Sequence, residues 1–356
     1  MSIKIAKKLW QISKKTKTHN LDKKHSHIVD SAKNFEFDKF LNSYRNWEKQ
    51  NDQEAPFQFN FYSFKSFGYF NYLRYFLGIL KGNLLYGFNQ RNYFFDDIKI
   101  IKLLNGFDIL EKCPVHKSPG NNIAYFLNKN ISANVRWLRY IYFATVIRNE
   151  DVISNANQTI LDIGSYYGGF QYVIKKIFPN SKHILVDFPH QLARSAIFLG
   201  KSFPEAKIHG IYDKHSLEKY FNNNYINHDF VLLSTEYYND FSERYTSLNY
   251  KLDLLTNFYS FGEISKNNFD SYFNSKILKN SNKLYFCNRY DSSPFFEPTY
   301  SEKYSLLNYL LKEFKVILNR QSGIHNYVAP VRTLFGEKRQ RPLSSSYFDL
   351  IQQREL

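Results

Sequence analysis

The sequence predicts an α/β protein with a doubly wound, Rossmann-like parallel sheet, preceded by a mainly helical N-terminal region. From residue 159 onward, short apolar runs alternate with amphipathic stretches, which is the pattern of strands and helices in a parallel sheet. The first of these runs ends in a glycine-bearing turn, and the second ends in a carboxylate. Residues 31–150, by contrast, show aromatic-rich stretches with helical spacing and no persistent alternation.

Length and composition are those of a folded protein of enzyme size. The chain has 356 residues and a mass of 42.5 kDa, which suits one catalytic domain with an accessory region, or two domains. Hydrophobic residues make up 43% and charged residues 22%, so a wholly disordered chain is excluded. Two cysteines favour a reducing, cytoplasmic setting. Because no apolar run reaches about 18 residues and no secretory signal is recognisable, neither a membrane-spanning helix nor export is expected.

Of the formal net charge of +16, a net +7 lies in the first 24 residues. The first 24 residues carry eight lysines against Asp22 alone, and the excess charge of the remaining chain is too thinly spread to indicate a nucleic-acid-binding surface. Ile5, Leu9 and Ile12 have helical spacing, so one interpretation is a basic amphipathic helix lying on an anionic membrane. We favour the other interpretation, a frayed and solvated basic tail over residues 1–30.

The change of pattern along the chain also predicts the domain organisation. Residues 31–155 are expected to form a helical accessory region, with helices over 61–90 and 131–148. Aromatic stripes in such helices are more typical of a core than of a substrate pocket. Residues 156–336 are expected to form the catalytic domain, and residues 337–356 a C-terminal tail in loop conformation.

The catalytic domain is predicted to open with a strand, a helix and a second strand. Residues 159–164 (TILDIG) form a short buried strand, and residues 168–178 form an amphipathic helix that Pro179 stops. The second strand, 183–189 (HILVDFP), ends in an acid and is followed by a helix over 190–203. Further strands are expected over 206–213, 229–238, 251–261, 283–291 and 314–319, and a further helix over 301–313.

The turn after the first strand and the end of the second strand carry the chemistry. Asp162 lies two residues before Gly164 in the turn GSYYGG (164–169), and Asp187 closes the next strand. In an open α/β sheet, ligands bind outside the carboxyl ends of the strands. Glycines let a ligand approach the backbone, and a helix N-terminus offers free N–H groups. A carboxylate at the end of the second strand is placed to bind both hydroxyls of a ribose, so the pattern predicts a nucleotide-type ligand.

Two ligands of this type fit the pattern, a dinucleotide and S-adenosylmethionine. The dinucleotide fingerprint requires G-x-G-x-x-G, whereas this turn has G-x-x-x-G-G with Tyr166 at its third position. Asp162 would repel a pyrophosphate and attract the ammonium and sulfonium groups of S-adenosylmethionine. The sequence therefore favours S-adenosylmethionine.

These segments resemble the sugar O-methyltransferase family, a bacterial group of class I S-adenosylmethionine-dependent methyltransferases. The family has an acid-x-Gly-x-Gly-Tyr-Gly-Gly turn, a strand ending in Asp-Leu-Pro, and an Asn followed by a Ser-Phe-x-Glu-Met segment. The corresponding segments here are 162–169, 186–189 and 257–264, and the resemblance covers about residues 155–330, roughly half of the chain. It implies a Rossmann-like class I methyltransferase sheet.

The resemblance also implies roles for the residues of the turn. Asp162 would hold the amino group of the methionine moiety, directly or through water. The backbone of Gly164, Ser165 and Gly168 would approach that end of the cofactor. Tyr166 stands where the family has its middle glycine, and a side chain there would crowd the methionine end.

The same resemblance assigns the nucleoside end of the cofactor. Asp187 would bind the ribose hydroxyls, with Phe188 against the adenine. The adenine edge is read by the residue that ends the third strand. That residue is Asp213 if the third strand is 206–213, or Glu236 if it is 229–238, and we favour Glu236 because VLLST is the better buried strand.

The acceptor end is assigned to the segment after the next strand. Asn257 and Phe258 would lie beside the transferred methyl group. A sugar hydroxyl has a high pKa and needs a base as the new bond forms. Glu263 is the first candidate for that base, or for gripping the sugar, and His325 in SGIHNY is the second. Glu263 could instead cap a helix, and His325 could be an ordinary surface or core residue.

Metal-ligand patterns are weak. Cys113 and His116 form half of a zinc pattern without a second half nearby. Asp253, Asp291 and Asn257 have the side chains of an oxygen-ligand Mg²⁺ site, which some sugar O-methyltransferases use, but their spacing does not support one.

The sequence therefore predicts a cytoplasmic S-adenosylmethionine-dependent O-methyltransferase that acts on a sugar hydroxyl of a nucleotide-sugar or a surface polysaccharide. The alternatives are an O-methyltransferase acting on another small molecule, such as a natural product, and a non-catalytic binding protein on the same fold. An amino-methylating nucleic-acid enzyme is disfavoured because Asn257 is followed by Phe-Tyr-Ser and not by Pro-Pro-Tyr. The basic N-terminus would suit peripheral contact with the inner face of an anionic membrane.

Overall fold

The computed structural model of the protein describes residues 2–15, 37–38, 57–59, 94–113, 123–126, 132–133, 135–154, 156–222, 227–292, 304–324, 331–333, 336–338 and 347–355. The chain divides into two compact units. The first consists of residues 1–37, 151–322 and 345–356, and the second of residues 38–150 and 323–344.

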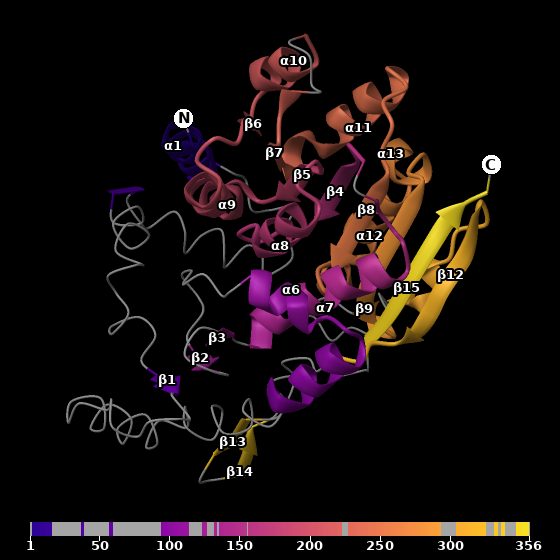
Figure 1. The fold of residues 1–356 in the computed structure, drawn as a ribbon. Helices are drawn as coiled ribbons and strands as arrows, with labels where there is room; N and C mark the ends of the chain where they lie inside the picture. The colour runs from indigo at the N-terminus through magenta and orange to yellow at the C-terminus, as the bar shows by residue number, and fades with distance from the viewer. Residues whose placement is uncertain are drawn as a thin grey trace. The chain divides into compact units, whose positions relative to one another are not determined.

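The first unit is built on an eight-stranded sheet of order β12-β15-β9-β8-β4-β5-β7-β6 (Figure 1). Its strands are β4 (Thr159–Ile163), β5 (Lys182–Asp187), β6 (Ile208–Ile211), β7 (Phe230–Ser234), β8 (Leu254–Phe258), β9 (Lys283–Arg289), β12 (Phe314–Gln321) and β15 (Tyr347–Arg354). The six strands from β6 to β9 in the sheet are parallel, while β12 and β15 are antiparallel to their neighbours. This confirms the predicted doubly wound, Rossmann-like sheet.

The order of the sheet creates a switch point beside β4. The chain leaves β4 toward β5 on one side, and it returns later to place β8 on the other side. Register brings the carboxyl ends of neighbouring strands to one edge, since Ile163 lies opposite Val186 and Asp187 lies opposite Ser234. This edge is where an open α/β sheet binds its ligands.

The parallel strands are buried on both faces, as their nearly continuous apolar sequences predict. One face packs against apolar residues of α10 (Lys214–Asn222), α11 (Tyr238–Ser247), α12 (Lys266–Phe273) and α13 (Lys276–Lys279). On the other side lie α8 (Gly169–Ile177) and α9 (Pro189–Ser202), both close to their predicted bounds (Figure 1). Pro189 at the first turn of α9 suits a position that makes no intrahelical N–H bond.

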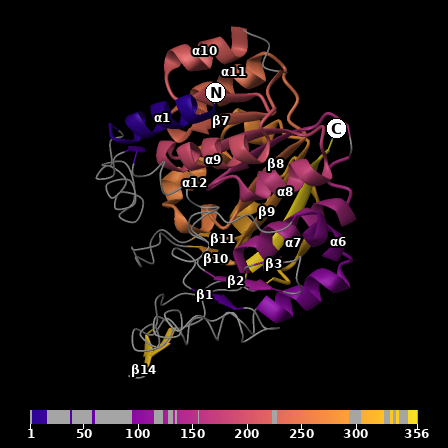
Figure 2. The ribbon, with the colours of Figure 1, turned by 60° about the vertical axis from the view of Figure 1, so that its left-hand side comes forward.

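The N-terminus differs from the frayed tail that we favoured. Residues Ser2–Ser13 form α1, which lies along α9 (Figure 2). Ala6, Leu9 and Trp10 are buried, at 0%, 0% and 2% exposure. A side chain at Gly200 of α9 would come within 2.4 Å of Ser2, so the glycine permits the close approach of the two helices. An isolated helix this short is marginal in water, and burial of its apolar face supplies the missing stability.

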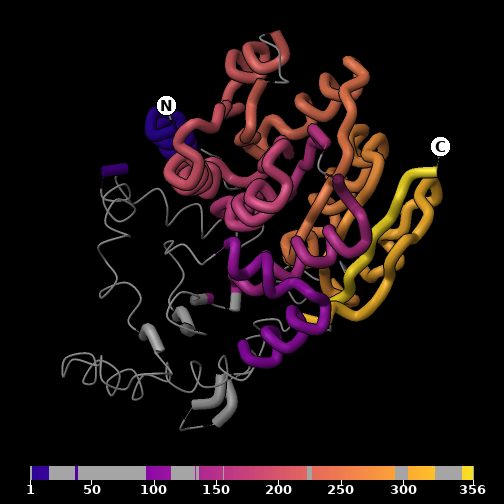
Figure 3. The backbone as a smooth tube through the Cα atoms, in the orientation of Figure 1, coloured from indigo at the N-terminus to yellow at the C-terminus, as the bar shows by residue number. Residues whose placement is uncertain are grey.

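The C-terminal residues also differ from the prediction. The tail was expected to be loop, yet Tyr347–Arg354 form β15, which pairs with β9 on one side and β12 on the other (Figure 3, yellow). Six successive residues of β15 are buried. The predicted helix over 301–313 is likewise wrong for its described part. There the chain forms β11 (Tyr304–Ser305), which pairs with β10 (Asp291–Ser292), and a 3₁₀ turn over Leu306–Tyr309.

The second unit contains helices and short strands. The predicted helix over 131–148 is confirmed as α7 (Val135–Asn149), and α6 spans Phe107–Lys112. Arg148 of α7 donates to both carboxylate oxygens of Asp108 of α6 at 2.9 Å. The strands are β1 (Phe57–Phe59), β2 (Ile123–Phe126), β3 (Ser132–Ala133), β13 (Val331–Thr333) and β14 (Gly336–Lys338). The predicted helix over 61–90 lies outside the described residues.

Across the described ranges, no helix combines the length and the apolar character needed to cross a membrane.

Candidate active site at the carboxyl edge of the sheet

Five segments meet at the carboxyl edge of the parallel strands. They are the turn 164–168 after β4, residues 187–188 after β5, residues 234–236 after β7, residues 257–263 after β8, and Arg289 at the end of β9. These segments include most of the site residues predicted from the sequence. His325 lies outside the described residues.

The turn after β4 has the backbone geometry that its glycines allow. Gly164 and Gly168 have φ values of +83° and +88°, which residues with a side chain rarely adopt. Gly168 is the N-cap of α8, so the turn leads directly into the helix N-terminus. The Oγ atom of Ser260, in the segment after β8, lies 2.3 Å from where a Cβ of Gly164 would stand. The segment that follows β8 therefore packs directly on the turn over residues 164–168.

Tyr166 occupies a left-handed conformation, with a φ of +54°. A bulky side chain is strained in this conformation. The Tyr166 ring packs edge-on against Tyr167, with 5.0 Å between ring centroids. Its carbonyl accepts a hydrogen bond of 2.8 Å from Ser195 of α9. Packing and hydrogen bonds thus hold the strained residue in place.

The carboxylate of Asp187 binds the turn from the neighbouring strand. One oxygen accepts from the backbone N–H of Tyr166 at 2.7 Å, and the other from the N–H of Phe188 at 2.7 Å. A carboxylate is also a group that can accept hydrogen bonds from ribose hydroxyls. The Phe188 ring is parallel to the ring of His190, at 6.0 Å. Asp187 therefore fixes the turn at the carboxyl edge of the sheet.

Asp162 is buried beneath the turn, at 4% exposure. Its carboxylate accepts hydrogen bonds from Gln171 of α8 at 2.6 Å and from Thr256 of β8 at 2.7 Å. Burial raises the pKa of Asp162 from 3.8 to about 7, and the nearby Asp187 charge adds to the rise, while the two hydrogen bonds oppose it. Gln171 and Thr256 were missed from the sequence. A polar Gln on the apolar face of the predicted helix was the available signal.

Two buried hydroxyls flank Asp187 without hydrogen-bond partners among the described residues. They belong to Ser165 in the turn and Ser234 at the end of β7, at 4% and 0% exposure. An unsatisfied buried hydroxyl is costly, and a ligand with polar groups would satisfy it. These hydroxyls, the positive-φ glycines and the two carboxylates fit the polar groups of S-adenosylmethionine.

The strand order bears on the two candidates for the adenine edge. β7 pairs with β5, whereas β6 lies beyond β7 at the sheet edge. Glu236 follows β7 and is exposed, while the Asp213 carboxylate accepts from the backbone N–H of Ser216 at 2.7 Å at the start of α10. Of the two, Glu236 lies on the strand adjacent to Asp187.

Asn257 is fully buried and bonded within the protein. Its amide group donates to the Ile163 carbonyl at 2.7 Å and accepts from the Asn288 amide and from the Phe261 N–H, both at 3.0 Å. It therefore ties together the ends of β4, β8 and β9, a structural role that the sequence did not predict. Phe258 packs against Phe170, with ring centroids 4.9 Å apart.

Glu263, the first candidate base, lies in a 3₁₀ turn over Phe261–Glu263. Its carboxylate pairs with the Arg289 guanidinium at 3.4 Å, and the two side chains are 21% and 4% exposed. Arg289 Nε also donates to the Tyr347 hydroxyl at 2.9 Å. Burial alone lowers the pKa of Arg289, yet the facing Tyr347 and Glu263 oxygens raise it above its ordinary value. Neither Arg289 nor Tyr347 was a predicted site residue.

The residues weighed for a metal do not converge. Asp253 lies before β8, at the opposite end from Asn257, and accepts from the Thr159 N–H at 2.8 Å. Among the described residues, no group of three or more His, Cys, Asp or Glu side chains could hold a metal ion. Cys113 is buried and forms no disulfide, and His116 lies outside the described residues.

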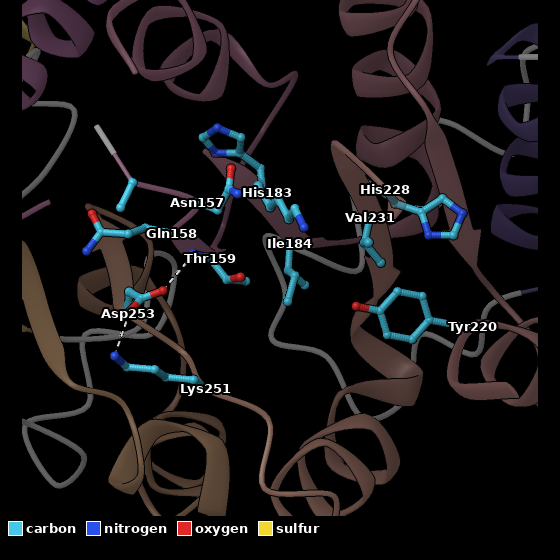
Figure 4. A pocket seen from close by; sticks show the side chains of 12 residues that line it. Asn157, Gln158, Thr159, His183, Ile184, Tyr220, His228, Val231, Lys251 and Asp253 are labelled. Carbon is cyan, nitrogen blue, oxygen red and sulfur yellow. Dashed lines mark hydrogen bonds and ion pairs between the residues drawn. The ribbon is translucent and has the colours of Figure 1, made fainter. Parts of the chain in front are cut away.

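A separate cavity of about 380 Å³ lies at the amino edge of the sheet (Figure 4). Thr159, His183, Tyr220, His228 and Asp253 are among its lining residues. Since parallel sheets bind nucleotide-type ligands at the carboxyl edge, the residues described above mark the better candidate site.

Comparisons with known proteins give fold-level likenesses. No protein-family model matches the chain, and no curated protein matches it. A candidate SAM-dependent methyltransferase from Streptococcus mutans is similar in structure, with 11% identity, a TM-score of 0.33, and coverage of 64% of this chain and 52% of that chain. The mitomycin 7-O-methyltransferase MmcR is similar with 10% identity, a TM-score of 0.31, and coverage of 62% and 57%. A SAM-dependent methyltransferase from Aquifex aeolicus has 13% identity, a TM-score of 0.31, and coverage of 59% and 88%.

The chain thus spans about half the length of the Streptococcus mutans protein. Likenesses at this level carry no argument about substrate or reaction. The fold assignment depends on the strand order and pairing of the sheet.

Proposed function

We propose that this protein is an S-adenosylmethionine-dependent O-methyltransferase that acts on a sugar hydroxyl. The observation that carries the proposal is the carboxyl edge of β4, β5 and β7, where a positive-φ glycine turn meets Asp162, Asp187 and two buried hydroxyls. This set of groups matches a ligand with an amino acid end and a ribose.

Different residues of the chain would bind different parts of the cofactor. Asp162 would interact with the ammonium group, directly or through water, and Asp187 would accept hydrogen bonds from the ribose hydroxyls. Phe188 would lie against the adenine, with Glu236 near its polar edge. The hydroxyls of Ser165 and Ser234 would make the hydrogen bonds that they lack within the described protein.

When bound, S-adenosylmethionine supplies an electrophilic methyl group for in-line transfer to an acceptor oxygen. The chain's contribution is to hold the acceptor in place, exclude water and receive the hydroxyl proton. The segment after β8 is suited to this task because Ser260 contacts the Gly164 turn and Glu263 follows three residues later.

A sugar acceptor is supported by the residues around Glu263. A carboxylate accepts hydrogen bonds from hydroxyl groups, and the partly exposed Tyr259 offers an aromatic face for stacking on the apolar side of a sugar. Nucleotide-sugars and surface polysaccharides, with a cytoplasmic place of action, are the acceptor class and setting that we propose.

Methyl transfer from radiolabelled S-adenosylmethionine tests the proposal directly. The acceptors are UDP-N-acetylglucosamine, GDP-mannose, dTDP-L-rhamnose and their methyl glycosides, with catechol and caffeic acid as non-sugar small molecules. Label in at least one sugar and in neither phenol is expected. Label only in the phenols would replace the sugar by another small-molecule acceptor, and label in none of them would contradict the proposed reaction.

A further inference from the structure

The C-terminal strand reaches the acceptor side of the site through a buried chain of polar contacts. Tyr347 is the first residue of β15, and its hydroxyl accepts from Arg289 Nε at 2.9 Å. Arg289 in turn pairs with Glu263 at 3.4 Å. The Arg289 side chain is only 4% exposed, so it has little access to solvent, whereas that of Glu263 is 21% exposed.

The turn that carries Glu263 is fixed by bonds from three other elements. Its Gly262 N–H donates to Asn288 Oδ1 at 3.0 Å, and the Asn288 amide donates to Asn257 at 3.0 Å. The hydroxyl of Tyr304 donates to the Phe261 and Ile264 carbonyls on either side. The backbone of the turn is therefore held independently of the Arg289–Glu263 pair, and Arg289 contacts the Glu263 side chain itself.

We propose that Tyr347 and Arg289 are positioning residues that hold the Glu263 carboxylate for its contact with the acceptor sugar. The inference rests on the proposed function and names the residues that give it an acceptor site. It also gives the C-terminal strand a role in the site, because the Tyr347 hydroxyl is a second partner, beside Glu263, of the buried Arg289 guanidinium.

A double-mutant cycle separates positioning from a structural role. Tyr347→Phe removes one hydroxyl and keeps the ring, which packs against Tyr259 at 4.8 Å between centroids. We expect about a tenfold fall in kcat/KM for the sugar acceptor, with the KM for S-adenosylmethionine changed less than about twofold. In a Glu263→Gln background, the same substitution should have little further effect, because the group that it positions is already neutralised.

The matched control is Tyr245→Phe. It also removes a buried phenol hydroxyl, which donates to the Lys251 carbonyl at 2.9 Å, but at the amino edge of the sheet. The acceptor is the sugar that the wild-type protein methylates in the panel above, and binding of S-adenosylhomocysteine is measured by calorimetry for each variant.

The outcomes of this experiment distinguish a positioning role of Tyr347 from a structural one. An effect of Tyr347→Phe no larger than that of Tyr245→Phe would overturn the inference and leave the proposed function standing. So would an effect of equal size in the Glu263→Gln background, since that would show a purely structural role. A wild-type protein that binds S-adenosylhomocysteine but methylates no sugar would remove the sugar acceptor and, with it, this inference.

Discussion

At the residue scale, the site combines a strained turn with two carboxylates of different character. Asp187 is half-buried and fixes the turn, whereas Asp162 is buried and has a pKa raised to about 7. The sequence placed both carboxylates correctly at strand ends. It could not show their different environments, because Gln171 and Thr256 reach Asp162 from two other elements.

Asp162 makes cofactor binding depend on pH. A cationic ammonium favours the ionised carboxylate, so binding should require loss of the proton that Asp162 holds below about pH 7. The affinity for S-adenosylmethionine should be constant above about pH 7 and fall by up to about tenfold per pH unit below it. Calorimetry in buffers of different ionisation enthalpy should detect proton release near pH 6. Asp162→Asn should bind more weakly and without this release, and a release unchanged by Asp162→Asn would contradict the assignment.

The same carboxyl makes the free energy of unfolding of the ligand-free protein depend on pH. Low pH, which weakens cofactor binding, stabilises the folded protein. Its pKa is higher in the folded state than the ordinary value of 3.8, so the folded state binds the proton more tightly. The stabilising contribution of the protonated form is therefore complete below about pH 4 and is lost as the pH rises toward 7.

Tyr166 provides a second test at the residue scale. Tyr166→Gly should relieve backbone strain of about 1 kcal/mol, partly offset by the greater freedom of glycine in the unfolded chain and by the lost contact with Tyr167. If the ring crowds the methionine end, the variant should also bind S-adenosylhomocysteine more tightly, as titration would show. Binding weakened by the glycine would instead make the Tyr166 ring part of the pocket.

At the element scale, prediction succeeded where the signal is local. The strands and helices between 159 and 203 agree with the structure because their burial produces clear periodicities. β15 was missed because it follows a Pro- and Ser-rich stretch, and its stabilising partners are β9 and β12, far away in the sequence. Tyr347 could not be placed in the site for the same reason.

α1 is the element whose stability depends most clearly on tertiary contacts. Leu9→Ala should lower the free energy of unfolding by about 2–5 kcal/mol, because Leu9 is fully buried in the helix that packs on α9. Lys7→Ala, on the exposed side of the same helix, should change it by less than about 0.5 kcal/mol. Urea denaturation measures both variants, and equal effects would mean that α1 is not docked.

At the scale of the whole molecule, the packing of α1 on α9 determines which residues of the basic N-terminus could contact a membrane. Ala6, Leu9 and Trp10 of this helix are buried, while Lys4, Lys7, Lys14 and Lys15 are exposed. Contact with an anionic membrane, which we propose from the charge alone, would therefore be electrostatic and sensitive to salt, without insertion of an apolar face.

The sheet as a whole brings residues from the middle and the end of the chain to one edge. The Rossmann-like order was predictable from the alternation of strands and helices, and so was the position of the glycine turn. On the acceptor side, only Glu263 was predictable. Arg289 and Tyr347 are separated by 58 residues, and they come together because β15 pairs with β9 in the antiparallel direction.

Calorimetric titration of S-adenosylhomocysteine into the wild-type protein tests the central claim most directly. Asp187→Ala removes both acceptor oxygens, Asp187→Asn keeps one for the Tyr166 N–H, and the exposed Asp240→Ala is the control. Wild type and the Asp240 variant should bind in the micromolar range, with Asp187→Ala at least about 100-fold weaker and Asp187→Asn in between. Wild-type protein that shows no binding at millimolar ligand would contradict the claim that this edge is a methyltransferase cofactor site.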